Sequence, residues 1–170
     1  MDASAARHQL ALDRVLVVVA RDPWQKRDRT LAPAEVRYEM VAAALDGVEG
    51  LEASRIELER DGPTYSIDTV EALDVPGREL FLIVGSEVAA GLPTWHRVDE
   101  LRERVTLSIV DRDPTPFPAP DGWRTARVAV PRLELSSTDL RDRVAAGAPI
   151  DFLVPVAAAH ILRAHRLYLD

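Results

Sequence analysis

The chain has 170 residues, 47% of them hydrophobic and 29% charged, with a formal net charge of −7. This composition is typical of a globular domain with a real core, and the acidity argues against non-specific binding to nucleic acid or to a membrane surface. The absence of cysteine excludes disulfides and thiolate chemistry, and no apolar run approaches the roughly 18 residues of a membrane helix. No secretory signal pattern is recognisable, so we expect a cytoplasmic protein.

Strand-like and helix-like segments alternate along the chain. Two of the strand candidates, at 13–20 and 79–84, are apolar enough to predict burial on both faces. The expected strands are 13–20, 51–58, 79–84, 105–110 and 124–130. The expected helices are 3–12, 34–45, 66–73, 88–92, 98–104, 139–146 and 155–166. The proline-rich stretch 113–122 is expected to be a loop.

This alternation predicts a doubly wound α/β fold with a mostly parallel sheet, and we find no linker to a second domain. Ligands of such folds bind beyond the C-terminal ends of the strands. The segments that follow the strand ends are 21–26, 85–87, 111–112 and 131–138. These segments hold cations, a glycine and a cluster of hydroxyl residues.

The hydroxyl cluster lies in the stretch LSSTDLR, residues 135–141. Ser136 can cap the following helix, and Asp139 can close a capping box with it. The same helix start can receive a phosphate, with Thr138 beside it and Arg141 able to fork two of its oxygens. A well-capped surface helix is the plain alternative.

Other candidates each have a structural alternative. Lys26 is either part of a solvated basic loop or a cation that reaches an anionic ligand. Thr64 and Tyr65 either cap a helix or hold a ligand carboxylate or amide at its start. Gly85 is either a turn glycine or a point of close ligand approach. Trp95 either covers the edge of the core or stacks on a flat heterocycle.

The histidines do not form a recognisable catalytic or metal site. His96 has no matched serine or cysteine nucleophile and no paired carboxylate at a familiar spacing. His160 and His165 are five residues apart on an expected helix, so they do not share a face. We therefore assign no metal ligand and no catalytic residue.

Six motifs occur together, in one order and at one spacing. They are PWQK (23–26), GPTYSIDT (62–69), FLIVGSE (81–87), LPTWHR (92–97), LSSTDLR (135–141) and DFLVP (151–155). Together they resemble the bacterial nicotinate-mononucleotide adenylyltransferases of the nucleotidyltransferase superfamily. The resemblance runs from about residue 5 to about residue 168.

This resemblance implies a single Rossmann-like domain of NAD biosynthesis. Members transfer AMP from ATP to nicotinate mononucleotide, giving nicotinate adenine dinucleotide and pyrophosphate without a covalent enzyme intermediate. Mg²⁺ accompanies the ATP phosphates and needs no protein ligands. The residues that match the ATP-binding positions are Gly85, Ser136, Thr138 and Arg141. Those that match the nicotinate-mononucleotide-binding positions are Lys26, Thr64, Tyr65, Glu87, Trp95 and Arg112.

Particular roles also follow from the resemblance. Trp95 is expected to stack on the pyridine ring, and Lys26 to contact a phosphate. Two positions depart mildly from the family, with Glu87 in place of aspartate and Leu135 in place of isoleucine. The longer Glu87 side chain changes the hydrogen bonds expected there.

A larger departure concerns the motif GGxFDPxHxGH, which the sequence does not contain. Arg7–Val15 instead resembles the end of the helix that follows this motif in the family. We expect the chain to be truncated at its N-terminus relative to the family, without the first, central strand. Its two neighbours would then have unpaired edges. Each missing cationic donor is typically worth about 10²–10³-fold in rate.

Three hypotheses remain open. The chain is an adenylyltransferase whose true start lies upstream, or a shortened homologue that binds a nucleotide without catalysis. The third is another member of the superfamily, such as a pantetheine-phosphate adenylyltransferase, against which GPTYSIDT and LPTWHR argue. Oligomeric state, a homo-oligomer included, and the preference for nicotinate over nicotinamide are left open by the sequence.

Overall fold

The computed structural model describes residues 2–23, 31–111 and 117–169. The chain forms two compact units, and each unit combines two separate stretches of sequence. The first unit comprises Met1–Val15 and Pro63–Arg132, and the second Leu16–Gly62 and Leu133–Asp170. Each unit has its own core, and the expectation of a single domain stays a prediction.

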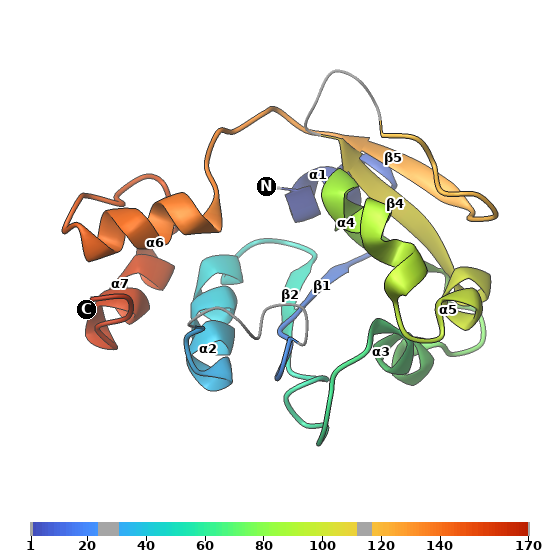
Figure 1. Cartoon of the computed structure of the whole chain (residues 1–170), viewed down its shortest axis with the longest axis horizontal. Helices are drawn as coiled ribbons and strands as arrows, with labels where there is room; N and C mark the ends of the chain where they lie inside the picture. Colours follow the sequence, from blue (N-terminus) through green and yellow to red (C-terminus); the bar gives the residue numbers. More distant parts are fainter. Residues whose placement is uncertain (1, 24–30, 112–116, 170) are drawn as a thin grey trace. The chain divides into compact units, whose positions relative to one another are not determined.

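The first unit is built on a three-stranded parallel sheet (Figure 1). It contains β3 (Leu80–Gly85), β4 (Val105–Asp111) and β5 (Thr125–Ala129), in the order β3-β4-β5. Leu80 lies opposite Val105, and parallel pairing continues along both ladders. Strand β4 is central and almost fully buried, Ser108 included.

Helices cover both faces of this sheet. On one face α4 (Ser86–Gly91) and the 3₁₀ turn η2 (Leu92–Thr94) bury Ala89 and Leu92 against β4. On the other face α1 (Asp2–Gln9) packs Ala6 against β4 and β5. The amide of Gln9 also exchanges hydrogen bonds with the backbone of Ala129, at 2.8 and 3.0 Å.

A second pair of helices in this unit lies at the start of β4. Helix α3 (Ser66–Leu73) packs beside α5 (Val98–Arg104), as Figure 1 shows. Their shared core is made by Ile67, Leu101 and Val105 with Val70. This pair joins the segment before α3 to the segment before α5, and both segments carry predicted site residues.

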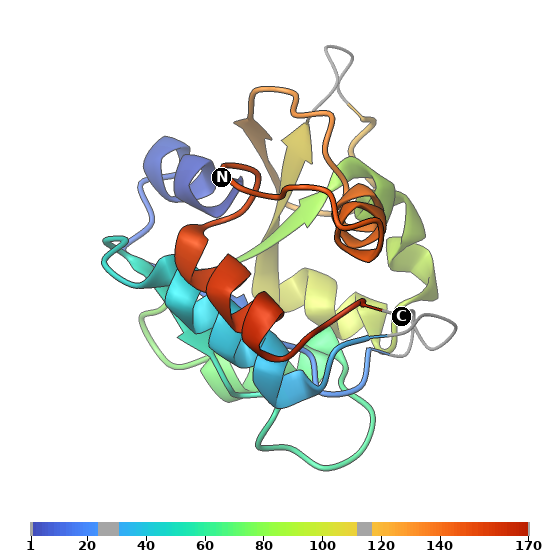
Figure 2. The same ribbon diagram turned by 90° about the vertical axis from the view of Figure 1, so that its left-hand side faces the viewer.

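The second unit contains β1 (Val15–Val18), whose first residue marks the unit boundary, hydrogen-bonded to β2 (Leu51–Ser54). Helix α2 (Ala34–Leu45) packs against β2 and lies alongside α7 (Val156–Ala164), as Figure 2 shows. Helix α6 (Ser137–Ala145) completes the unit through a core of Val144, Ile150 and Ala159.

The predicted α/β class with a parallel sheet is confirmed, and some boundaries differ. Strand β2 ends at Ser54 rather than at residue 58, because Leu58 and Glu59 both donate to the carbonyl of Arg55 and form a turn. Burial on both faces is wrong for both predicted runs, 13–20 and 79–84, since Val15 alone is buried in β1 and Val84 alone in β3. Within the described residues β3 pairs only with β4 and β1 only with β2, so each has the expected unpaired edge.

No helix in the described ranges combines the length and the hydropathy that crossing a membrane requires.

Candidate functional site

Two predicted aromatic residues of the first unit pack on one core cluster. Tyr65 and Trp95 both lie, half-buried, against the cluster that contains Ile67 and Leu101. The ring of His96 lies on Tyr65, with centroids 4.3 Å apart and planes tilted by 31°. Trp95 also packs against the neighbouring cluster around Leu92 and Ile109, and so joins two of the core clusters of this unit.

Thr64 and Tyr65 form the segment that leads into α3. Tyr65 is the N-cap residue in extended conformation, and its own side chain makes no capping hydrogen bond. Thr64, which precedes it, is buried with 7% of its surface exposed. The choice between a hydroxyl cap and a ligand site at this helix start stays a prediction. The first N–H groups of this helix face a position where an anionic oxygen is favoured.

Gly85 and Glu87 lie where β3 passes into α4. Gly85 has an ordinary φ of −75°, and a Cβ placed on it would meet nothing within 4 Å. Neither backbone strain nor crowding by protein atoms requires glycine here. The free space beside its backbone is consistent with close approach by a ligand. Glu87 is exposed in the first turn of α4.

The hydroxyl cluster of the second unit forms the predicted capping box. The Ser136 hydroxyl accepts from the Asp139 N–H at 3.1 Å, and the Asp139 carboxylate accepts from the Ser136 N–H at 2.8 Å. The carboxylate also accepts from the Ser136 hydroxyl at 2.6 Å. These hydrogen bonds hold the pKa of Asp139 below its usual value.

Arg141, which lies next to this cap, contacts two other side chains. The guanidinium of Arg141 donates to the Thr138 hydroxyl at 3.2 Å and stands over the ring of Tyr168, 5.9 Å from its centroid. Tyr168 in turn packs on the core of the second unit. Thr138 and Arg141 therefore lie side by side at the first turn of α6, a chemistry that suits phosphate oxygens.

The predicted site residues thus fall into two groups. Thr64, Tyr65, Gly85, Glu87 and Trp95 belong to the first unit, and Ser136, Thr138 and Arg141 to the second. Lys26 and Arg112 lie outside the described residues. The assembly of both groups around one pair of nucleotides stays a prediction.

Sequence reasoning gave no role to Arg97, which the structure makes the centre of an ion-pair cluster. Its guanidinium contacts Glu71 and Glu100 at 2.6 Å and Asp68 at 3.6 Å. Its backbone is left-handed, with a φ of 50°. The spacing of Asp68 and Glu71, three residues apart on one helix, is the signal that could have indicated a partner cation.

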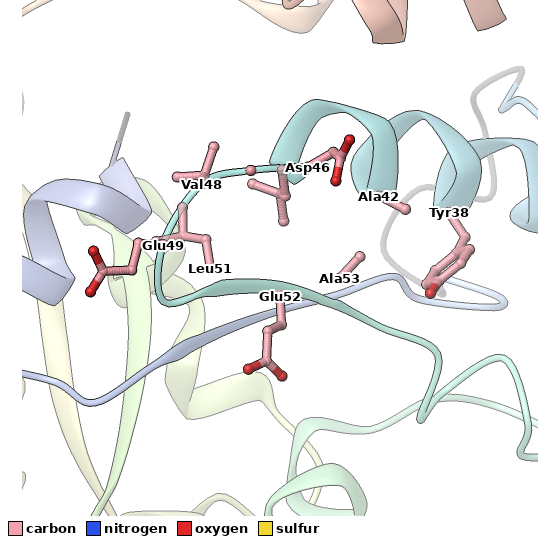
Figure 3. Close-up of a pocket in the computed structure, with 10 residues that line it drawn as sticks. Tyr38, Ala42, Asp46, Val48, Glu49, Leu51, Glu52 and Ala53 are labelled. Carbon is pink, nitrogen blue, oxygen red and sulfur yellow. The ribbon is translucent and has the colours of Figure 1, made fainter.

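A shallow, open depression lies between the end of α2 and β2 in the second unit (Figure 3). Its lining includes Tyr38, Leu51 and the carboxylates of Asp46, Glu49 and Glu52. The three carboxylates point in different directions and do not converge. Within the described ranges, no group of three or more metal-ligating side chains is placed to hold an ion. None of the predicted site residues that the structure describes lines this depression.

Comparisons with known proteins agree on one family. A family described as cytidylyltransferase-like matches residues 3–143. Proteins named probable nicotinate-nucleotide adenylyltransferase are 37% identical in Corynebacterium kroppenstedtii and 39% identical in Methylibium petroleiphilum. These matches cover 98% and 96% of this chain and 82% of each relative. A relative of the same name from Streptomyces coelicolor is 37% identical, over 98% of this chain and 90% of its own length.

Solved structures show the same fold. Two structures of Plasmodium falciparum nicotinic acid mononucleotide adenylyltransferase, complexed with APC and with NaAD, match with TM-scores of 0.76 and 0.68. They are 14% and 17% identical and cover 99% and 95% of this chain and 88% and 89% of their own. The fold is therefore that of a nucleotidyltransferase. The chain belongs to the cytidylyltransferase-like family and, within it, to the nicotinate-nucleotide adenylyltransferases.

Proposed function

We propose that this chain is an adenylyltransferase that transfers AMP from ATP to nicotinate mononucleotide, in the cytoplasm. The observation that carries the proposal is the packing of Tyr65 and Trp95 on one core, at the start of α3. A flat, negatively charged heterocycle suits this arrangement, because aromatic faces stack on the ring and backbone N–H groups favour its carboxylate.

The acceptor nucleotide would contact mainly the first unit. Trp95 stacks on the pyridine ring, while Thr64 and Tyr65 hold the carboxylate end. Glu87 hydrogen-bonds a neutral polar group of the acceptor, since its own charge repels the anionic ends. Lys26 and Arg112 supply cations for the phosphate, which a chain of net charge −7 must provide locally.

ATP would be held by Gly85 and the start of α6. The adenosine lies against the open backbone at Gly85. The triphosphate meets the start of α6 at Ser136, Thr138 and Arg141. The Thr138 hydroxyl and the Arg141 guanidinium donate to its anionic oxygens, while the Ser136 hydroxyl donates to Asp139 and shapes the helix start. These donors fit phosphate and do not fit a metal ion. Mg²⁺ bound to the phosphates neutralises part of their charge and needs no carboxylate cage from the protein.

The reaction needs position and charge compensation from the protein. A phosphate oxygen of nicotinate mononucleotide forms a bond to the α-phosphorus of ATP, and the bond from that phosphorus to the bridging oxygen of the β-phosphate breaks. Pyrophosphate leaves with that oxygen and its electron pair. Arg141 and the hydroxyls around it orient the triphosphate and offset the charge on the leaving group.

A second function is favoured by one sequence observation. The histidines at 8, 96, 160 and 165 do not form the HxGH pattern whose side chains neutralise ATP phosphates in the family. A homologue that binds nicotinate mononucleotide without turnover is the corresponding alternative.

The test is adenylyl transfer by the purified 170-residue chain with Mg²⁺ and ATP. Nicotinate mononucleotide, nicotinamide mononucleotide and phosphopantetheine are offered separately, and pyrophosphate and the adenylylated product are measured. Pyrophosphate formed in step with nicotinate adenine dinucleotide supports the proposal. Binding of nicotinate mononucleotide without pyrophosphate supports the second function. Turnover with phosphopantetheine and ATP, but with neither mononucleotide, contradicts both proposed functions.

A further inference from the structure

We propose that Arg97 is a positioning residue that sets the spacing between Tyr65 and Trp95, and thereby the affinity for the acceptor nucleotide. The inference rests on the proposed function, because it assumes that these two aromatic residues receive the acceptor. Arg97 itself needs no contact with either nucleotide.

Two carboxylates, those of Glu71 and Glu100, each form a bidentate pair with the Arg97 guanidinium. Nη2 and Nη1 donate to the two oxygens of Glu71 at 2.6 and 3.2 Å. Nε and Nη2 donate to the two oxygens of Glu100 at 2.7 and 2.6 Å. Asp68 adds a third carboxylate at 3.6 Å. Such bidentate pairs fix direction as well as distance, so the guanidinium has one well-defined position.

The cluster joins the two segments that carry the aromatic residues. Asp68 and Glu71 belong to α3, which begins directly after Tyr65. Arg97 follows Trp95 by two residues, and the ring of the intervening His96 lies on Tyr65. The ion pairs therefore hold the Trp95 segment against the helix that positions Tyr65.

Backbone geometry and electrostatics both point to a held conformation. Arg97 has a φ of 50°, a left-handed conformation that costs free energy for a residue other than glycine. The hydrogen bonds from Arg97 lower the pKa of Glu71 and of Glu100, and these carboxylates raise the pKa of Arg97. The hydrogen bonds to Glu71 and Glu100 thus favour the charged forms of these partners and hold Arg97 in its left-handed conformation.

Arg104 provides a matched control in the same pair of helices. It is the last residue of α5 and pairs with Asp74, at 2.8 Å, and with Glu71, at 3.8 Å. Like Arg97 it bridges α5 to the carboxylates of α3. It lies seven residues along the chain from Arg97 and outside the Trp95 segment. Replacing Arg104 therefore tests the contact between the two helices without altering the segment that carries Trp95.

The experiment measures nucleotide affinity by calorimetry for the whole chain and its variants. We expect R97Q to weaken nicotinate mononucleotide binding by tenfold or more and to change ATP binding by less than twofold. R97K keeps the positive charge but cannot form bidentate hydrogen bonds with two carboxylates. We therefore expect a smaller loss of nicotinate mononucleotide affinity than in R97Q. R104Q should leave both affinities unchanged. If R97Q does not fold, R97K and E100Q provide the same comparison with R104Q.

Three outcomes would overturn the inference. The first is an equal loss in R97Q and R104Q, which would mean helix bracing only. The second is an equal loss of ATP and acceptor affinity in R97Q, or no loss in any Arg97 or Glu100 variant. The third is a wild-type chain that does not bind nicotinate mononucleotide, which overturns the proposed function first and is recognised without any variant.

Discussion

The hydroxyl of Ser136 accepts a hydrogen bond from the Asp139 N–H at 3.1 Å and donates one to the Asp139 carboxylate at 2.6 Å. Ser136 is also one of the residues proposed to meet the ATP phosphates. Its hydroxyl therefore has two roles, because it holds the start of α6 in shape and lies where the triphosphate is expected. Thr138 and Arg141 depend on that shape for their own positions.

Removing the Ser136 hydroxyl should lower both stability and ATP affinity. Loss of an N-cap typically costs about 1 kcal/mol, so urea unfolding of S136A should show a decrease of that size. Calorimetry should show weaker ATP binding and unchanged binding of nicotinate mononucleotide. S137A is the matched control, since the neighbouring serine is exposed and should change stability by less than about 0.5 kcal/mol. Equal effects of S136A and S137A would refute the capping role.

The Arg97 cluster predicts a pH-dependent contribution to stability. Arg97 lowers the folded-state pKa of Glu71 and of Glu100 below the ordinary value of 4.5. A lowered carboxylate pKa stabilises the fold above the unfolded value and loses that contribution as pH falls through the folded value. The difference in unfolding free energy between wild type and R97Q should thus be present at pH 7 and shrink below about pH 4.5. A difference that stays constant from pH 7 to pH 3 would contradict the ion-pair assignment.

Arg37 should be a strong determinant of the stability of the second unit. Its guanidinium donates to the carbonyls of Ala20, Ala32 and Arg21 at 2.7, 3.0 and 3.2 Å, and burial lowers its pKa. Hydrogen bonds from a charged donor contribute about 1.5–3 kcal/mol each. We expect R37A to lower the free energy of unfolding by about 2–4 kcal/mol.

R37K is the companion variant for this prediction. The lysine ammonium group keeps the positive charge but lacks the planar guanidinium that donates to three carbonyls. The decrease in the free energy of unfolding should therefore be smaller in R37K than in R37A. Urea unfolding of both variants checks the order. A loss below about 0.5 kcal/mol in R37A would show that these carbonyls find other partners at little cost.

Ser108 should be replaceable without loss of stability. It is fully buried at the centre of β4, and within the described structure its hydroxyl has no hydrogen-bond partner. An unsatisfied buried hydroxyl costs about 1–3 kcal/mol of desolvation. S108A should therefore leave the free energy of unfolding unchanged or raise it by up to about 1 kcal/mol. A clear decrease would indicate a hydrogen bond to the hydroxyl, such as one through a buried water.

Local patterns in the sequence predicted much of the fold. The pattern at 105–110 predicted a strand, which the structure shows as β4 (Val105–Asp111), and the spacing of Ser136 and Asp139 predicted the capping box. Both follow from short-range chemistry, in which residue type and spacing alone determine the hydrogen bonds or the buried face. The boundary of β2 was wrong because an apolar run cannot distinguish a strand from a hydrogen-bonded turn at Arg55.

Long-range pairing accounts for what the sequence did not predict. The sequence of β3 predicts a strand buried on both faces. Its burial also depends on the strands beside it, and among the described residues β3 has a partner strand on one edge only. Arg97 was passed over because its partners Glu71 and Asp68 are more than 25 residues away in sequence and come beside it only through the packing of α3 on α5. The roles of the site residues came from the family resemblance rather than from spacing.

The most direct test of the central claim is a fluorescence titration of the chain with nicotinate mononucleotide. The claim is that the acceptor stacks on Trp95, and Trp123 provides the control because it packs, half-buried, on the same two core clusters. Saturable quenching of tryptophan emission in wild type and in W123F, with loss of acceptor affinity in W95F and W95L, is the predicted result. Affinity and quenching that persist in W95L, or no saturable binding in wild type, would contradict the claim.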